Sequence, residues 1–376
     1  MDNLKQKVKK FLYNLNYKIL MRNVILLESS PDFSDNTRGF YDELIKEGYN
    51  KKYKIVWVLN SSKNFKDIKT KNVKFIQRKN KIIFYYYNIF SKYIVDCNNF
   101  VNKYNKNQKR IHLTHGATIK VTTDYCSMVG NIDYLVQIGN FFTDINSKMF
   151  KAKKEQIITT GFPRNDILLN NKEVFLPEIK RKKTILWLPT YRKHKNNPSS
   201  KNAQLKYGVP IIKTEQEIIK LNEVLKENDI LLLIKLHPAE DTTNIKSLEL
   251  SNIKLITNDI FEKNHLTLYH FLNSTDALIT DYSSIYYDYL LTRKPIALAI
   301  DDLKEFSHNN ELLFDNFEEN IIGFYLYKFN DLINFIKNIG DNIDLEKDKR
   351  LKIIEKYFKY DDDQSAKRII KYLELK

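Results

Sequence analysis

The chain has 376 residues, of which 43% are hydrophobic, and its 62 Lys and Arg against 46 Asp and Glu give a formal net charge of +16. This length suggests about two domains of ~100–200 residues each, and no stretch approaches the ~20 consecutive apolar residues of a membrane-spanning helix. Two cysteines are too few for a disulfide framework or a zinc site, and the basic residues 1–20 lack the apolar block of a signal peptide. We therefore expect a protein of a reducing compartment.

In the first half of the chain, short apolar runs alternate with amphipathic stretches of helical period. The runs are typical of buried strands in a parallel sheet, and the stretches are typical of the helices that cover it. We expect strands at 24–27, 53–59, 73–76, 93–96, 111–114, 134–138 and 156–160, with helices at 38–47, 81–90 and 141–153.

The polar segment 170–183 contains Pro177 and ends in a cluster of basic residues, so we place the domain boundary there. After it the alternating pattern begins again. We expect strands at 184–188, 230–236, 253–256, 277–280 and 295–300, and helices at 215–227, 266–274, 284–292, 331–338, 345–358 and 364–373. The pattern predicts an α/β protein with two doubly wound parallel-sheet domains, 1–175 and 176–376, that face each other across a cleft.

Ligands of open α/β sheets bind at the carboxyl ends of the strands, which makes the polar residues there informative. His115 follows the strand near 111–113 and is placed to act as a general base, and Gly116 lets a substrate approach the backbone. The alternative is a histidine that is hydrogen-bonded within a turn. Strand alternation points His112 to the other face, where it should pack or cap.

Two arginines follow further predicted strands. Pro163 can open a helix, which would place Arg164 beside free N–H groups; alternatively Arg164 pairs with Asp166 in a structural turn. Arg192 can clamp a phosphate with two hydrogen bonds, or it can lie on a solvated loop.

Two more strand ends carry candidate anion-binding groups. Lys235 and His237 end the most apolar strand, where a buried ammonium group is costly unless it meets an anion or reaches water. In the segment 280–284, Ser283 or Ser284 can cap the following helix, whose free N–H groups attract a diphosphate. A cap without a ligand is the alternative.

These groups are cationic or neutral donors without a pair of carboxylates. They indicate a site for a phosphorylated donor and argue against glycoside hydrolysis. No metal-ligand spacing, Gly-rich phosphate loop or Ser–His–Asp order is present, and the acidic run 361–363 is explained as the first turn of a helix. We therefore predict neither a metal nor a cofactor.

The ordered motifs HG, GFPRND, LPTYR, KLHP and TDYSSIYYDYLL–KPI resemble the CDP-glycerol glycerophosphotransferase family of teichoic-acid and capsule synthesis. The opening NVILLESSPDFSDNTRGFYDEL is similar to that family's first strand, SDN loop and helix, and DDDQSAKRII is similar to its C-terminal motif. Two departures are Thr114, where the family often has Trp, and the missing Gly of the closing motif.

The resemblance implies a GT-B fold with two Rossmann-like domains. It also implies transfer of a polyol phosphate, first of all glycerol phosphate, from a CDP-activated donor to a hydroxyl of a lipid-linked or polyol-phosphate acceptor, with release of CMP. Members are peripheral proteins on the cytoplasmic face of the membrane. The net charge of +16 and the expected basic, aromatic N-terminal helix suit an anionic membrane surface.

The resemblance also assigns roles to the residues found above. His115 would be the base, beside Thr114 and Gly116 on the acceptor side, and His237 would donate to the diphosphate or act as acid toward CMP. The remaining expected contacts of the CDP diphosphate are Arg164, Arg192, Lys235, Thr280, Asp281, Ser283 and Ser284.

Two alternatives remain open at this point. The first is a GT-B glycosyltransferase that uses a nucleotide sugar for a cell-surface polysaccharide. The second is a non-catalytic basic protein that binds anions, although scattered Lys does not favour nucleic-acid binding. The polyol, the acceptor, the choice between priming and polymerisation, and the oligomeric state are also open.

Overall fold

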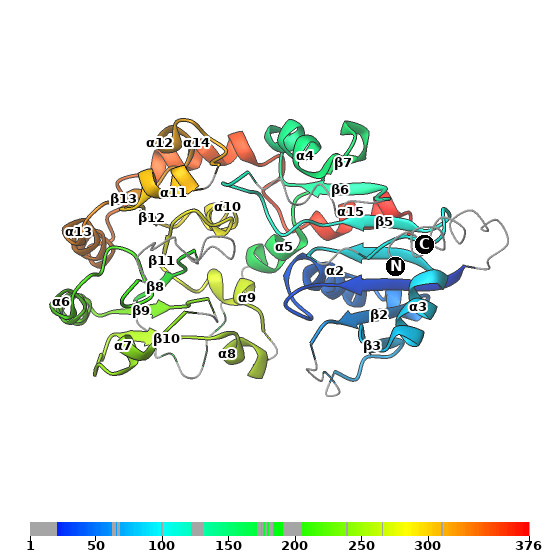
Figure 1. Cartoon of the computed structure of the whole chain (residues 1–376), viewed down its shortest axis with the longest axis horizontal. Helices are drawn as coiled ribbons and strands as arrows, with labels where there is room; N and C mark the ends of the chain where they lie inside the picture. The colour runs from blue at the N-terminus through cyan, green and yellow to red at the C-terminus, as the bar shows by residue number, and fades with distance from the viewer. Residues whose placement is uncertain are drawn as a thin grey trace. The chain divides into compact units, whose positions relative to one another are not determined.

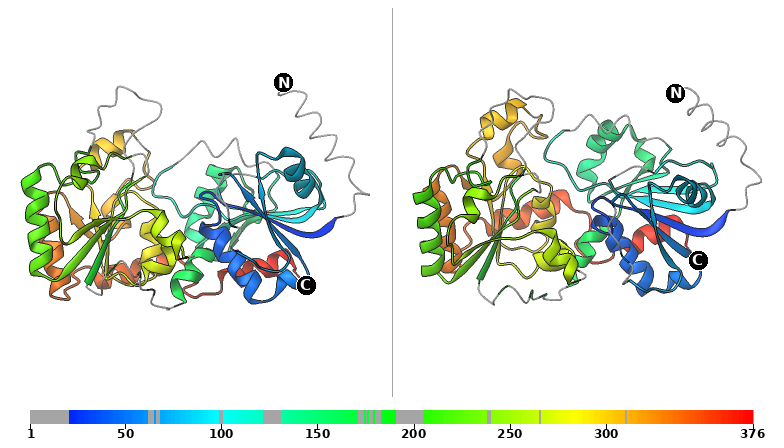
Figure 2. Two further views of the ribbon diagram at one scale, coloured as in Figure 1. Left: turned by 90° about the horizontal axis from the view of Figure 1, so that it is seen from below. Right: turned by 60° about the horizontal axis from the view of Figure 1, so that its bottom comes forward.

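The computed structural model divides the chain into two compact units, each built around a parallel sheet (Figures 1 and 2). It describes residues 21–61, 65, 68–98, 101–121, 131–170, 174, 176, 179, 183–190, 205–237, 240–264, 266–309 and 311–375. Unit 1 comprises Met1–Ala117, Thr122–Asn170 and Lys356–Lys376, and unit 2 comprises Thr118–Val121 and Asn171–Glu355.

Within the described residues, unit 1 contains a seven-stranded parallel sheet of order β3-β2-β1-β4-β5-β6-β7. Helices α2, α5 and α15 pack against one another, whereas α3 packs on β1, β3 and β4. The strands are β1 (Arg22–Glu28), β2 (Lys54–Leu59), β3 (Val73–Gln77), β4 (Ser91–Asp96), β5 (Lys109–His112), β6 (Tyr134–Gln137) and β7 (Ile157–Thr159). The helices are α2 (Asp35–Lys46), α3 (Lys81–Phe90), α4 (Thr143–Phe150), α5 (Pro163–Leu169) and α15 (Ser365–Leu373).

Unit 2 contains, in its described part, a six-stranded parallel sheet of order β10-β9-β8-β11-β12-β13. Its strands are β8 (Lys183–Trp187), β9 (Ile230–Ile234), β10 (Ile253–Leu255), β11 (Ala277–Thr280), β12 (Ile296–Ala299) and β13 (Phe324–Leu326). Its helices are α6 (Glu215–Glu227), α7 (Thr243–Lys246), α8 (Asn258–Lys263), α9 (Leu268–Leu272), α10 (Ile285–Leu290), α11 (Leu303–Asn309), α12 (Phe317–Asn320), α13 (Phe329–Gly340) and α14 (Lys347–Tyr357), which continues into unit 1.

Local sequence explains why these elements form where they do. The central strands are buried on both faces, and β9 is an unbroken run of five buried apolar residues, as expected for a sheet covered by helices on both sides. Helix α6 begins at a capping box, in which Glu217 N donates to the Thr214 hydroxyl at 3.2 Å and Thr214 N donates to the Glu217 carboxylate at 2.9 Å.

Both sheets place their first strand in the interior, so the strand order reverses direction beside it. This switch lies between β1 and β4 in unit 1 and between β8 and β11 in unit 2. Loops diverge from such a point at the carboxyl edge, which is where α/β sheets bind ligands. The candidate residues that the structure describes lie at this edge in each unit.

The predicted fold class, α/β with two doubly wound parallel sheets, is confirmed. Strand ends differ by a few residues: β5 stops at His112, so residues 113–116 form a loop. Strand β13 and the short helices α7, α8, α11 and α12 were not predicted from the sequence. No helix in the described ranges is long and apolar enough to cross a membrane.

The two units differ from the predicted division at residue 175. Helix α15 belongs to unit 1, because the Asp166 carboxylate accepts the backbone N–H groups of Ser365 at 2.9 Å and Ala366 at 2.7 Å. Residues 118–121 belong to unit 2, where Val121 N donates to the Glu311 carbonyl at 2.8 Å. In both cases the contact joins segments that are far apart in sequence, so local composition does not reveal to which unit each segment belongs.

Candidate active site

In unit 1, His115 forms a hydrogen-bonded ring with two residues from other elements. Its Nδ1 atom is paired with Oδ2 of Asp35, the first residue of α2. Oδ1 of the same carboxylate accepts from Nη1 of Arg164 in α5 at 2.8 Å, and this Nη1 also donates to the His115 carbonyl at 2.9 Å. The ring fixes both the imidazole and the backbone that carries it.

The backbone around this ring adopts conformations that side chains usually avoid. Asp35 and Thr114 both have a φ of 58°, and a positive φ is unusual for a β-branched residue such as Thr114. Buried Asn36 stabilises the loop: its Nδ2 donates to the Thr114 carbonyl at 2.9 Å, and its Oδ1 accepts from Arg164 N at 3.3 Å. Such over-determined strain is typical of functional sites.

The hydrogen-bonded ring of His115, Asp35 and Arg164 combines a buried ion pair with an accessible imidazole. The side chains of Asp35 and Arg164 are 6% and 2% exposed, whereas that of His115 is 58% exposed. Burial alone would raise the pKa of Asp35, but the charges and hydrogen bonds of Arg164 and His115 outweigh it and hold this pKa well below its usual range. Asp35 is therefore an ionised partner for His115.

The structure changes the interpretation of three neighbouring residues. Arg164 is buried against Asp35 instead of being open to a phosphate, and the alternative, a pairing with Asp166, is also wrong. The Thr114 side chain is buried, so its contribution to the loop comes from its carbonyl. Gly116 has a φ of 127°, which suits glycine.

A second Asp–His pair lies deeper in unit 1. Asp96 Oδ1 is 2.7 Å from His112 Nδ1, and its Oδ2 lies 2.9 Å from Nη2 of Arg110. All three side chains are buried, and burial lowers the pKa of His112 despite the neighbouring carboxylate. The expectation that His112 packs is confirmed.

In unit 2, the carboxyl ends of β9, β8 and β11 are neighbours, which brings three of the predicted segments together. Asp281 is fully buried and accepts from Thr190, with the backbone N at 2.9 Å from Oδ2 and the hydroxyl at 2.5 Å from Oδ1. The buried Thr280 hydroxyl donates to the Leu188 carbonyl at 2.9 Å. Thr280 and Asp281 therefore hold the loop that follows β8.

Lys235 and His237 extend beyond β9 at the same edge. Lys235 N donates to the Trp187 carbonyl at 3.0 Å, which continues the pairing with β8. The Lys235 side chain is half-buried, and burial lowers its pKa; in the described part of the chain no carboxylate pairs with it. His237 is exposed.

Ser283 and Ser284 are half-buried where α10 begins, but the predicted side-chain cap does not form. Instead their carbonyls accept from Tyr286 N at 3.2 Å and Tyr287 N at 3.1 Å, respectively. Arg192, the remaining predicted contact, lies outside the described residues. Among the residues that are described, no group of three His, Cys, Asp or Glu side chains could hold a metal ion.

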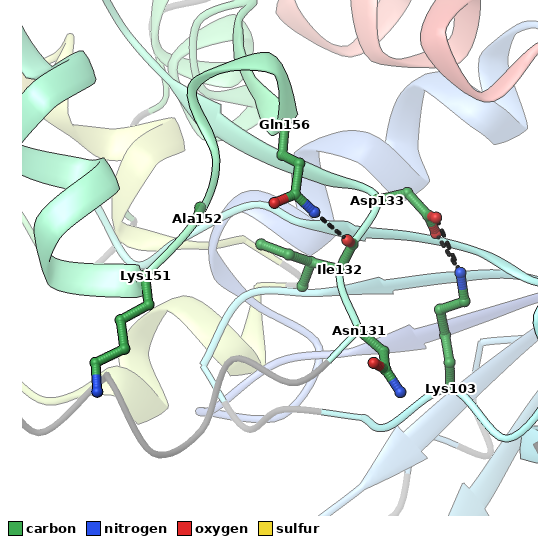
Figure 3. A pocket seen from close by; sticks show the side chains of 7 residues that line it. All are labelled: Lys103, Asn131, Ile132, Asp133, Lys151, Ala152 and Gln156. Carbon is green, nitrogen blue, oxygen red and sulfur yellow. Dashed lines mark hydrogen bonds and ion pairs between the residues drawn. The ribbon is translucent and has the colours of Figure 1, made fainter. Parts of the chain in front are cut away.

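A cavity of about 300 Å³ lies at the amino ends of β5, β6 and β7, the edge opposite His115 (Figure 3). Two contacts join residues of its lining: Lys103 Nζ lies 2.8 Å from Asp133, and Gln156 Nε2 donates to the Ile132 carbonyl at 2.7 Å. None of the predicted site residues lines it. The cavity is lined by Lys103, Asn131, Ile132, Asp133, Lys151, Ala152 and Gln156.

Asp35 is the site residue that the sequence interpretation did not single out. It lies in the SDN loop between the first strand and its helix, at the same carboxyl edge as the other candidates. A carboxylate in that position was a usable signal. Its partners, however, are 80 and 129 residues away in sequence.

Two doubly wound parallel sheets, with candidate groups at both carboxyl edges, define a GT-B fold of the kind that nucleotide-dependent transferases use. The solved structure of the wall teichoic acid polymerase TagF matches 99% of this chain and 95% of its own, with a TM-score of 0.75 and 20% identity. The chain belongs to the CDP-glycerol:poly(glycerophosphate) glycerophosphotransferase family, whose sequence profile matches residues 11–375.

Two curated proteins of teichoic acid synthesis are similar to this chain. The teichoic acid ribitol-phosphate polymerase TarL of Staphylococcus aureus (strain NCTC 8325 / PS 47) is 25% identical over 99% of this chain and 66% of its own length. The teichoic acid glycerol-phosphate primase of Bacillus subtilis (strain 168) is 29% identical over 64% of this chain and 57% of its own. The chain thus spans about three fifths of the length of these two relatives.

Proposed function

We propose that this protein transfers a polyol phosphate, most directly glycerol phosphate, from a CDP-activated donor to a hydroxyl of a polyol-phosphate acceptor, in teichoic acid or capsular polysaccharide synthesis. The observation that carries the proposal is the accessible His115 held by buried Asp35 and Arg164. Membership of the family supports the CDP-linked donor. The named relatives support a polyol phosphate as the transferred group.

In the proposed reaction, His115 takes the proton of the acceptor hydroxyl through Nε2, because Nδ1 is engaged by Asp35. The hydroxyl oxygen then attacks the phosphorus that carries the polyol. A new P–O bond forms, and the bond to the bridging oxygen breaks, so that CMP leaves with the electron pair. General-base assistance of this kind contributes about 10²- to 10⁴-fold in rate.

Unit 2 supplies the proposed donor side. Lys235 brings a positive charge without a carboxylate partner in the described chain. His237, which is exposed, is the proposed donor to the diphosphate or the proposed acid toward departing CMP. Ser283 and Ser284 offer hydroxyls at the same sheet edge, and Arg192 is a further proposed contact. Thr280 and Asp281 act indirectly, by holding the loop after β8. This is catalysis by position and charge, as in other phosphoryl transfers.

We further propose that the enzyme works at the cytoplasmic face of an anionic membrane, on a lipid-linked acceptor. Helix α3 supports this, because Ile82, Tyr85 and Tyr86 are 85%, 42% and 37% exposed on it. The Arg22 guanidinium lies 5.0 Å from the centre of the Tyr86 ring. Exposed tyrosines and basic groups suit a membrane interface, and the net charge of +16 suits anionic lipid. Sedimentation with vesicles containing phosphatidylglycerol, against neutral vesicles, tests this placement.

The reaction is tested with purified protein, CDP-glycerol or CDP-ribitol, and a short polyol-phosphate acceptor, by measuring CMP release. We expect release that depends on the acceptor and on one donor, and that His115→Ala lowers about 10²- to 10⁴-fold. Activity with UDP-sugars alone would replace the proposal with a glycosyltransferase. Binding of the anionic donors without turnover of any of them would indicate a non-catalytic anion-binding protein.

A further inference from the structure

Unit 1 contains two Asp–His pairs with the same atoms facing each other but with different surroundings. In both, a carboxylate oxygen faces Nδ1 of the imidazole while an arginine binds the carboxylate. The His112 ring is buried, whereas the His115 ring is exposed. A fixed Nδ1 with an accessible ring is the arrangement that a base requires, since the second nitrogen then faces the substrate.

We infer that Asp35 is the positioning residue of this site: it keeps the proton of His115 on Nδ1 and leaves Nε2 as the proton acceptor. Arg164 is the second positioning residue, because it binds the other oxygen of the same carboxylate. The inference rests on the proposed function for its effect on rate. Its structural content, the location of one proton, is independent of any substrate.

The two oxygens of the Asp35 carboxylate bind different partners, and this makes the inference specific. Arg164 can only donate, so it needs an acceptor at Oδ1, and Nδ1–H of His115 needs an acceptor at Oδ2. An amide at position 35 has only one oxygen. In Asp35→Asn that oxygen turns toward the Arg164 cation, and the NH₂ group then faces Nδ1, which forces the imidazole proton onto Nε2.

Asp35 and Arg164 supply the contacts that hold His115. Asp35 on α2 binds the imidazole, and Arg164 on α5 binds both Asp35 and the His115 carbonyl. The Cys97 thiol lies close to Asp35, but burial and the nearby carboxylates of Asp35 and Glu28 raise its pKa well above the usual value, so it stays neutral. The thiol therefore adds no charge beside Asp35.

The test combines nitrogen NMR with kinetics. The full chain is labelled with ¹⁵N-histidine, and His115→Gln identifies the His115 signals among those of the seven histidines. We expect Nδ1–H in the wild-type protein and Nε2–H in Asp35→Asn. We also expect kcat of Asp35→Asn to fall about 10²- to 10⁴-fold, with KM for the CDP-polyol changed less than threefold.

Two further variants keep the inference falsifiable. In Asp35→Asn with Arg164→Met, the amide oxygen is released and can face Nδ1 again, so the Nδ1–H form should return; this variant also removes the unpaired buried charge if Asp35→Asn alone folds poorly. Asp42→Asn is the matched control, because Asp42 lies on the same helix and pairs with Arg38 at 2.8 Å. It should change neither the NMR signals nor the rate.

The possible outcomes separate the two proposals. Retention of Nδ1–H in folded Asp35→Asn, or a wild-type kcat in that variant, overturns the positioning role. Loss of stability without a change of the imidazole proton would also overturn it, since that result is what a purely structural Asp35 gives. A wild-type protein with Nδ1–H on His115 but no CMP release contradicts the proposed function and leaves the assignment of Asp35 intact.

Discussion

The carboxyl edges of the two sheets use charge in opposite ways although the strand order around them is the same. In unit 1 the charged groups pair with each other, as Asp35 does with Arg164 and His115. In unit 2 the buried carboxylate of Asp281 binds Thr190, and no carboxylate among the described residues pairs with Lys235. The edge of unit 1 therefore fixes the imidazole of His115. The edge of unit 2 has a positive charge, that of Lys235, which an anionic ligand can neutralise.

Removal of His115 should give the largest effect. His115→Ala removes the proposed base, and we expect kcat for CMP release to fall by about 10²- to 10⁴-fold. The matched control is His308→Ala, because His308 is exposed on α11 in the other unit. Equal activity of His115→Ala and the control would show that the unit 1 edge does not supply the base.

Replacement of Lys235 tests the unit 2 edge. Lys235→Met removes the charge proposed to bind the diphosphate, and charge-assisted hydrogen bonds contribute about 1.5–3 kcal/mol, so KM for the donor should rise about 10- to 100-fold. The melting temperature should stay equal or rise, because an apolar group replaces a half-buried ammonium.

Lys226→Met is the control for this change, since Lys226 is an exposed lysine on α6. It should leave KM unchanged. A drop in stability of Lys235→Met without any change in KM would mean that Lys235 serves the fold.

Asp281 should matter for stability more than for chemistry. Asp281→Ala leaves partly buried donors of Thr190 without their acceptor, which costs about 1–3 kcal/mol of unfolding free energy. Chemical denaturation measures the change, and Thr190→Val combined with Asp281→Ala in a double-mutant cycle isolates the hydrogen bond of the Thr190 hydroxyl. Additive effects of the two substitutions would show that this hydroxyl does not hold the loop.

The smallest expected effect is the contribution of Asp166 to the pH dependence of the unfolding free energy. Asp166 is also a second buried carboxyl group of unit 1, to compare with Asp35. Burial, more than any neighbouring charge, raises the pKa of Asp166 to about 7, whereas the pKa of Asp35 is lowered. Folded Asp166 therefore keeps its proton up to about pH 7, while the unfolded chain loses it near pH 4. Between these values the folded state binds more protons, so the unfolding free energy contributed by Asp166 decreases as the pH rises.

The measurement compares wild type with Asp166→Ala. The difference in unfolding free energy between them should be larger at pH 5 than at pH 8, by roughly 1 kcal/mol or more. A difference that is constant over this range would show that the Asp166 carboxyl is ionised throughout.

Much of the site could be predicted because it lies at strand ends. His115, Lys235 and Asp281 were all found by asking which polar residues follow a buried apolar run. The roles of Arg164 and Ser284 could not be predicted in this way. Local rules favoured a nearby acid as the partner of Arg164, but in the structure Arg164 binds Asp35. They also favoured a side-chain cap by Ser284, but the Ser284 side chain makes no capping hydrogen bond to α10.

The two parallel sheets can be predicted from the amino-acid sequence, because apolar runs and helical periods are short-range properties of the chain. Which strand ends meet depends on long-range packing and could not be predicted. The acid that binds Arg164 is 129 residues away from it, although Asp166 is two residues away. Strand order and crossovers set such partners, and they depend on how helices pack on both faces of a sheet. The closing helix α15 joins unit 1 for the same reason: the acceptor for its first N–H groups is Asp166, about 200 residues earlier.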